Sequence, residues 1–74
     1  MLKSSEKHYY ELRFDYPLMN DIMKIMKEEN IEQVDQNFEL SCSITLALRK
    51  AEVNKVLSKF DRIENLKIDY ITTK

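Results

Sequence analysis

Residues 38–48 read FELSCSITLAL, with an apolar side chain at every second position. Six apolar residues thus alternate with five small or polar ones. A period of two places each set on its own face of an extended strand, whereas a helix would scatter both sets around its circumference. The stretch predicts a long strand with one buried face, and the rest of the chain is organised around it.

A second alternating stretch lies at residues 8–16, where four apolar residues are separated by mostly charged ones, and it predicts a strand before Pro17. Proline suits the first turn of a helix, so we expect a helix over residues 17–29. Its apolar stripe contains Leu18, Ile22 and Ile25, which we expect to cover the sheet. A second helix is predicted over residues 49–64, from the apolar positions Val53, Val56, Leu57 and Phe60.

The chain has no glycine, so left-handed backbone positions must fall on other residues. Asparagine tolerates this conformation best, and the candidates are Asn20, Asn30, Asn37 and Asn65. Asn30 and Asn65 follow the two predicted helices and are expected to end them. A short strand at residues 31–36, a turn over Asp35 to Asn37 and a last strand at residues 66–71 complete the prediction.

The predicted order is βαββαβ, which gives an α+β, ferredoxin-like fold: a four-stranded antiparallel sheet with two helices on one face. We expect residues 1–7 to form a disordered tail and residues 8–74 a single ferredoxin-like domain. The helix-free face of the sheet should carry polar residues, namely Glu11, Arg13, Asp15, Glu39, Ser41, Ser43, Thr45, Lys67 and Asp69.

The composition excludes several kinds of function. Without glycine the chain cannot form the usual phosphate-binding loops of nucleotide enzymes. One histidine, His8, and one cysteine, Cys42, cannot build a zinc site or a catalytic group, so we expect a non-enzyme with no metal and no cofactor. No apolar run is long enough for a membrane span, and a free thiol suits a reducing compartment, so a soluble, cytoplasmic protein is expected.

Several motifs lie between residues 9 and 60: YEL at 10–12, DY at 15–16, Phe38 and SITLAL at 43–48. In these motifs the chain resembles the C-terminal domain of the YigZ/IMPACT family of conserved cytosolic proteins. The resemblance implies a ferredoxin-like domain that follows a larger N-terminal domain and binds nucleic acid or a ribosome-related surface. It implies no catalytic residues. The chain departs from the family pattern at Arg49-Lys50, where members commonly have proline, and at residues 61–65, where they have glycine.

Two functional hypotheses follow for a non-catalytic accessory domain. Twelve basic and thirteen acidic residues leave a net charge of −1, so any binding of nucleic acid must be local and weak. Lys55, Lys59 and Arg62 share one face of the second predicted helix and could contact RNA or a ribosomal partner as an anion-binding ridge. The alternative is a protein-interaction or dimerisation module without nucleic-acid binding.

The first predicted helix has the candidate protein interface. Met19, Met23 and Met26 make its apolar stripe wider than a helix on a sheet requires. Flexible thioethers adapt well to partner surfaces, although they also fill irregular cores. We expect at least one of the three methionines to stay partly exposed, facing either a preceding N-terminal domain or a second copy in a homodimer.

Overall fold

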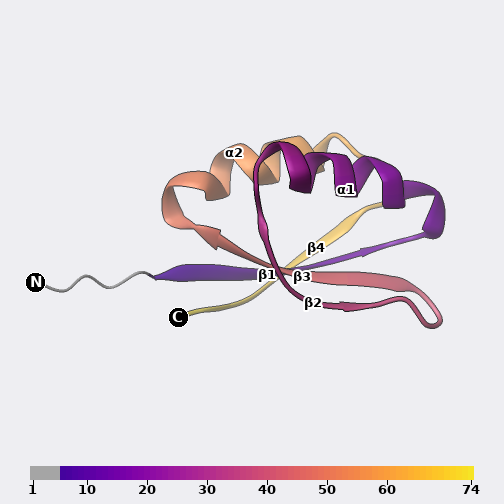
Figure 1. Cartoon of the computed structure of the whole chain (residues 1–74), viewed down its shortest axis with the longest axis horizontal. Coiled ribbons are helices and arrows are strands. Elements are labelled where there is room, and N and C mark those ends of the chain that lie inside the picture. Colours follow the sequence, from indigo (N-terminus) through magenta and orange to yellow (C-terminus); the bar gives the residue numbers. More distant parts are fainter. Residues whose placement is uncertain (1–5) are drawn as a thin grey trace, which may run out of the picture.

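The computed structural model describes residues 6–74 and has six regular elements and one 3-10 turn. In chain order they are β1 (Lys7–Phe14), the 3-10 turn η1 (Tyr16–Leu18), α1 (Met19–Glu28), β2 (Glu32–Asn37), β3 (Cys42–Arg49), α2 (Lys50–Asp61) and β4 (Lys67–Thr73). The sheet order is β2-β3-β1-β4, and each neighbouring pair is antiparallel. Both helices cover the same face of the sheet (Figure 1). The predicted ferredoxin-like α+β fold is confirmed.

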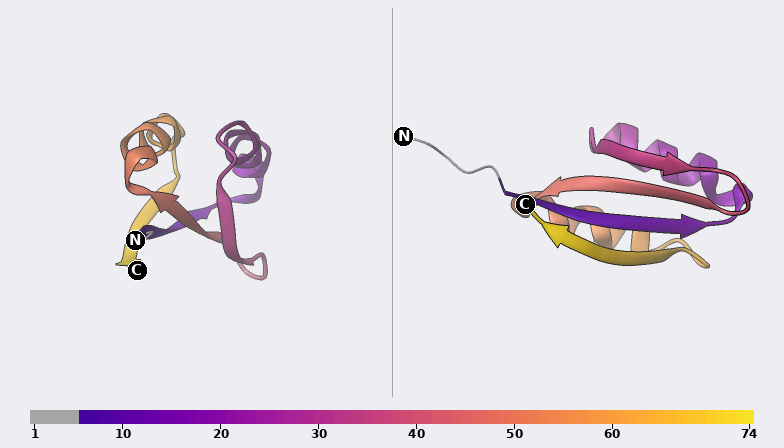
Figure 2. Two further views of the ribbon diagram at one scale, coloured as in Figure 1. Left: turned by 60° about the vertical axis from the view of Figure 1, so that its left-hand side comes forward. Right: turned by 90° about the horizontal axis from the view of Figure 1, so that it is seen from below.

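The core lies between the helices and the two central strands, β1 and β3. These strands pair over their full length, with Leu12 opposite Ile44 and Phe14 opposite Cys42. Alternation directs one set of side chains towards the helices, so Leu12, Ile44, Leu46 and Leu48 are fully buried. Figure 2 shows the two helices side by side above the twisted sheet, whose other face has no helix. The strongest alternation in the sequence therefore marks the centre of the sheet.

The two helices meet the core in the same way. Each buries two side chains four residues apart, Ile22 and Met26 in α1 and Val56 and Phe60 in α2. An asparagine with positive φ follows each helix, Asn30 at 53° and Asn65 at 67°, as predicted. Asn20 and Asn37, the other two candidates, do not adopt this conformation.

The ends of the two helices differ in detail. After α1, the Ile31 N–H donates to the Met26 carbonyl at 3.0 Å and the Asn30 N–H to the Lys27 carbonyl at 3.2 Å. These two bonds form a Schellman motif around a left-handed residue. After α2, which ends at Asp61, the Ile63 N–H donates to the Phe60 carbonyl at 3.0 Å, so the prediction that Asn65 ends this helix is wrong, although its φ is positive. The observed helices are also shorter than the predicted ranges 17–29 and 49–64.

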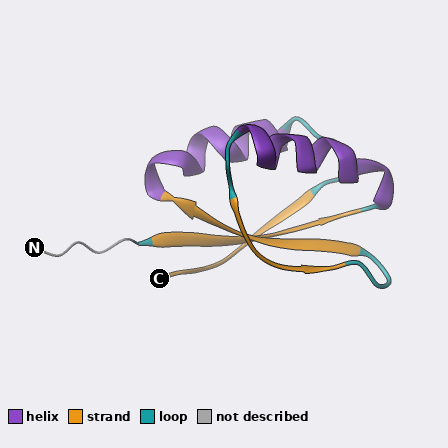
Figure 3. Ribbon diagram, viewed as in Figure 1, coloured by secondary structure: helices purple, strands orange, loops and turns teal. Residues whose placement is uncertain are grey.

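The hairpin between β2 and β3 corrects the prediction for residues 38–41. β3 begins at Cys42, and the preceding four residues form the loop, drawn in teal in Figure 3. Leu40, expected on the buried face, is fully exposed at 102%. The Asn37 side chain accepts the Glu39 N–H at 3.0 Å, so the turn begins at Asn37 and the predicted turn at 35–37 is wrong. This local polar contact outweighs the alternating pattern at the start of the stretch.

Two further boundaries differ from the prediction. β1 ends at Phe14, and Tyr16 is 68% exposed, because the chain turns into a 3-10 helix in which the Leu18 N–H donates to the Asp15 carbonyl at 3.0 Å. Lys7 belongs to β1, although residues 1–7 were predicted as a tail. The Lys7 N–H donates to the Lys74 carbonyl at 2.8 Å, and the Lys74 N–H donates to the Lys7 carbonyl at 2.9 Å. Residues 1–5 of the predicted tail lie outside the described residues.

Candidate functional site

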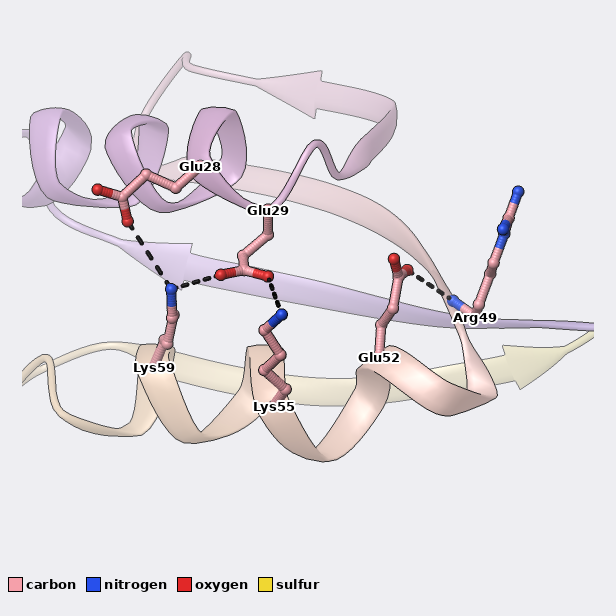
Figure 4. Close-up of polar contacts among 6 residues, drawn as sticks. All are labelled: Glu28, Glu29, Arg49, Glu52, Lys55 and Lys59. Atoms are coloured by element: carbon pink, nitrogen blue, oxygen red, sulfur yellow. Dashed lines mark hydrogen bonds and ion pairs between the residues drawn. The ribbon is translucent and has the colours of Figure 1, made fainter.

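The predicted anion-binding ridge on α2 is engaged with α1. The Lys55 ammonium lies 3.2 Å from a Glu29 carboxylate oxygen, and Lys59 donates a hydrogen bond to the other oxygen of Glu29. Lys59 also lies 3.8 Å from Glu28 (Figure 4). Of the three cations of the ridge, Arg62 is the one that makes no ion pair with any residue in the range 6–74. Two of the three cations expected to contact phosphate are therefore already neutralised within the domain.

The Glu29 carboxylate holds this cluster together. Its side chain is only 11% exposed, and it lies at the C-terminal end of α1, where the helix dipole disfavours a negative charge. The hydrogen bond from Lys59 lowers the pKa of Glu29, against the opposing effect of desolvation. The same bond raises the pKa of Lys59. Both groups are stabilised in their charged forms, so the cluster clamps the end of α1 to the middle of α2.

A backbone contact fixes the start of α2 near the same cluster. The Glu52 carboxylate accepts the Arg49 N–H at 3.4 Å, which satisfies one free amide at the helix N-terminus (Figure 4). Arg49 ends β3 and α2 begins at the next residue, so there is no connecting loop. The family resemblance places a proline here. Glu52 instead provides the cap with a carboxylate in the first turn, where the helix dipole favours it.

The methionines of the predicted interface occupy different environments. Met26 is 6% exposed and belongs to the core, where the sequence placed Ile25 instead. Ile25 is only half-buried. Met19 and Met23 are also half-buried, as expected for at least one of the three. The helix is rotated so that Met26, and not Ile25, points into the core with Ile22.

A groove lies between α1 and the start of β2. It has a volume of about 480 Å³, and its lining combines apolar and positively charged side chains: Met23, Lys24, Met26, Lys27, Asn30, Ile31 and Gln33. Within residues 6–74, neither Lys24 nor Lys27 makes an ion pair. Two unpaired lysines therefore flank this groove on α1, whereas the sequence had placed the functional cations on α2.

The strand beside this groove is an edge of the sheet. All six residues of β2 are exposed, and only β3 pairs with it. Its register against β3 shifts at Val34, with Gln33 opposite Leu46 and Asp35 opposite Thr45. Bulges and charged side chains are common on edge strands, because an uncovered edge offers its free N–H and C=O groups to another strand. The α1–β2 flank thus combines a free strand edge with an apolar groove.

The helix-free face of the sheet is polar, as predicted. A row of residues across it runs Asp35, Thr45, Glu11 and Asp69, and the next row contains Ser43, Arg13 and Lys67. Arg13 Nε lies 3.2 Å from a carboxylate oxygen of Glu11, and Lys7 Nζ lies 2.6 Å from a carboxylate oxygen of Glu32. Three of the residues expected on this face, Asp15, Glu39 and Ser41, lie outside the strands. Mixed charges, several of them paired, favour a hydrated surface.

His8 has contacts that the sequence did not reveal. Its Nδ1 lies 3.2 Å from the Thr73 hydroxyl, which also bonds the Tyr70 hydroxyl. Its Nε2 is buried without a hydrogen-bond partner among the described residues. His8 and Thr73 are 65 positions apart, so no local pattern could have predicted the contact. The chain of contacts links β1 to β4 near both termini.

Among residues 6–74, no three His, Cys, Asp or Glu side chains are grouped so as to hold a metal ion. Cys42 is buried in the core, where its thiol packs as a small apolar group. No helix among these residues is both long and apolar enough to cross a membrane.

Comparison with family models, curated proteins and solved structures found no match for this chain. The similarity to the YigZ/IMPACT C-terminal domain therefore stays a prediction. The α1–β2 flank is the candidate site because a free strand edge lies there beside a groove with unpaired lysines.

Proposed function

We propose that this domain is a non-catalytic accessory module that binds a protein partner through the flank formed by α1 and β2. The observation that carries the proposal is the free β2 edge beside the groove lined by Met23 and Ile31. Added strands use such an edge for backbone hydrogen bonds and the neighbouring groove for side-chain contacts. This is the interaction-module alternative drawn from the sequence, and it is compatible with an accessory role like that of the YigZ/IMPACT C-terminal domain.

The competing RNA hypothesis has less support. Its ridge on α2 loses two of three cations to Glu28 and Glu29. A phosphate that approaches Lys55 or Lys59 would meet an ammonium group whose charge is already offset by a carboxylate, so its attraction would be weaker. Within residues 6–74, Tyr9 is the only aromatic residue whose register places it on the helix-free face, so the sheet offers few aromatic rings on which bases could stack.

A photo-crosslinking experiment separates the two hypotheses. Benzoylphenylalanine would replace Lys24 beside the groove in one variant and Arg62 on α2 in the other; both positions are exposed. After irradiation in cells, adducts from position 24 should be sensitive to protease and resistant to ribonuclease, and position 62 should give none. Ribonuclease-sensitive adducts at position 62, with none at position 24, would overturn the proposal.

A further inference from the structure

We propose that the occupant of the α1–β2 flank is an extended, acidic segment that pairs with β2 and places an aliphatic side chain in the groove. This inference rests on the proposed function and adds the chemistry of the partner. The segment has its aliphatic residue at a helix-facing position, carboxylates two residues before and after it, and neutral hydroxyl residues between. Each of these features is required by a different part of the flank.

The extended conformation follows from the position of β2. The strand is the outermost in the sheet and is exposed along its whole length. A partner strand would meet backbone groups on that edge that β3 does not use. In an added strand, side chains alternate between the helix layer and the helix-free face, so every second residue of the partner approaches α1.

The aliphatic anchor follows from the lining of the groove. Met23 and Ile31 are half-buried and Met26 forms part of the floor, so a side chain lying between them would be removed from water. Methionine side chains adjust to the shape of an incoming group at little cost. A polar anchor would lose its hydration here without gaining a matching set of hydrogen bonds.

The carboxylates follow from charge. Lys24 and Lys27 flank the groove, and within the described residues they have no acidic partner. They are separated by about 4.5 Å along the helix axis, and helix-facing residues of an added strand are about 7 Å apart. Flexible lysine side chains span that difference, so acidic residues next to the anchor on the helix side can each reach an ammonium group.

The hydroxyl residues follow from the opposite face of β2. Register places Glu32 and Asp35 on the helix-free side, where they would lie beside the intervening residues of the partner. An acidic residue beside Asp35 would face a like charge across the new strand pair, whereas Glu32 is already paired with Lys7 and offers little attraction to a basic one. The charge requirement therefore differs between the two faces of one segment, and this makes the expected sequence pattern specific.

A second copy of the chain fits the flank less well. Pairing β2 with β2 of another copy would bring Glu32 and Asp35 of both copies onto one face of the junction. It would also direct Gln33 and Gln36, the helix-facing residues of β2, towards the apolar groove. Neither the charges nor the side chains of β2 complement its own flank.

The test uses the whole chain, labelled with ¹⁵N, and the capped heptapeptide TETITET as probe. Titration should shift the amide resonances of β2 and of α1 around Lys24, leaving those of β4 unchanged. The charge-reversed peptide TKTITKT should bind at least about tenfold more weakly, because two attractions become repulsions. In the double variant Lys24→Glu, Lys27→Glu, the preference should invert in favour of TKTITKT.

Several outcomes would overturn the inference. Equal affinity for the two peptides would remove the charge argument, and binding of TETSTET as tight as that of TETITET would remove the anchor. Shifts confined to β4 or α2 would place the site elsewhere. Resonances of β2 that move with protein concentration alone would identify a second copy as the occupant. Protein adducts from position 24, together with equal peptide affinities or tight binding of TETSTET, would retain the proposed function and reject only the chemistry of the partner.

Discussion

The two halves of the molecule follow the same plan. β1-α1-β2 and β3-α2-β4 each consist of a central strand, a helix, an asparagine with positive φ, and an edge strand with an irregular register. Even the buried pairs on the helices have the same spacing, Ile22 with Met26 and Val56 with Phe60. Similar backbones therefore produce two flanks, each between a helix and an edge strand.

The flanks differ in the side chains that line them. On the β4 side, Phe60 is 0% exposed, the ring of Tyr70 packs edge-on against Tyr10 with centroids 5.5 Å apart, and the groove of about 600 Å³ beside them has no lysine among the described residues of its lining. On the β2 side, Met26 takes the place of the phenylalanine, and two unpaired lysines flank the groove. Both flanks therefore have a groove, and the charge of the lining, not topology, distinguishes them.

The largest difference between the halves should appear in core substitutions. Phe60→Ala should lower the free energy of unfolding by about 3–5 kcal/mol, because it removes a fully buried aromatic ring from a small core. Met26→Leu, at the matching position of α1, should cost less than about 1.5 kcal/mol, since the volume is nearly conserved. Urea titration measures both. Losses of similar size would show that the α1 half is packed as rigidly as the α2 half.

Much of the shared plan could be predicted from the sequence. Alternation found β1 and most of β3, and the absence of glycine directed attention to Asn30 and Asn65 as left-handed positions. These signals are local, and they agree with each other on one topology. They fail at residues 38–41, where an apolar alternation continues into a hairpin loop and leaves Leu40 in water.

The features that distinguish the halves could not be predicted in the same way. The contacts of Glu29 with Lys55 and Lys59 join residues from different helices, so they depend on the packing of the whole domain. β2 is a strand without an apolar pattern, because neither of its faces is buried. The periodicity of apolar residues cannot define the rotation of a helix to within one residue. In α1, it is Met26 that is buried, and Ile25 is half-buried.

The two asparagines with positive φ should respond alike in both halves. Asn30→Ala and Asn65→Ala should each cost about 1 kcal/mol, because alanine is strained at the positive φ that asparagine tolerates. Asn54→Ala, an exposed position within α2, should be neutral or slightly stabilising and serves as the control. Thermal unfolding of the three variants gives the comparison. A loss at Asn30 without one at Asn65 would show that only the Schellman motif depends on asparagine.

The smallest effect concerns the clamp between the halves. The folded state lowers the pKa of Glu29, so its contribution to stability is present above the ordinary pKa of about 4.3 and is lost as pH falls through the lower, folded value. Glu29→Gln should therefore be less stable than the natural chain at neutral pH. The difference should shrink as the solution is acidified below that range.

Lys59, the partner of Glu29 in the clamp, should lose its contribution to stability at high pH. The folded state raises the pKa of Lys59, so its contribution is present below about 10.4 and is lost as pH rises through the higher, folded value. Glu64→Gln, at an exposed glutamate with no ion pair in the described part of the chain, is the control for both arms. A gap between Glu29→Gln and the natural chain that does not change between acidic and neutral pH would contradict this account.

Amide hydrogen exchange with the probe peptide TETITET tests most directly whether the acidic segment selects the α1–β2 flank. With the peptide at about ten times its Kd, outward-facing amides of β2 should exchange about tenfold more slowly, and those of β4, the other edge strand, should be unchanged. Slowing of the same size along β4, or along residues 55–62 of α2 with none in β2, would contradict the assignment of the docking flank to α1 and β2.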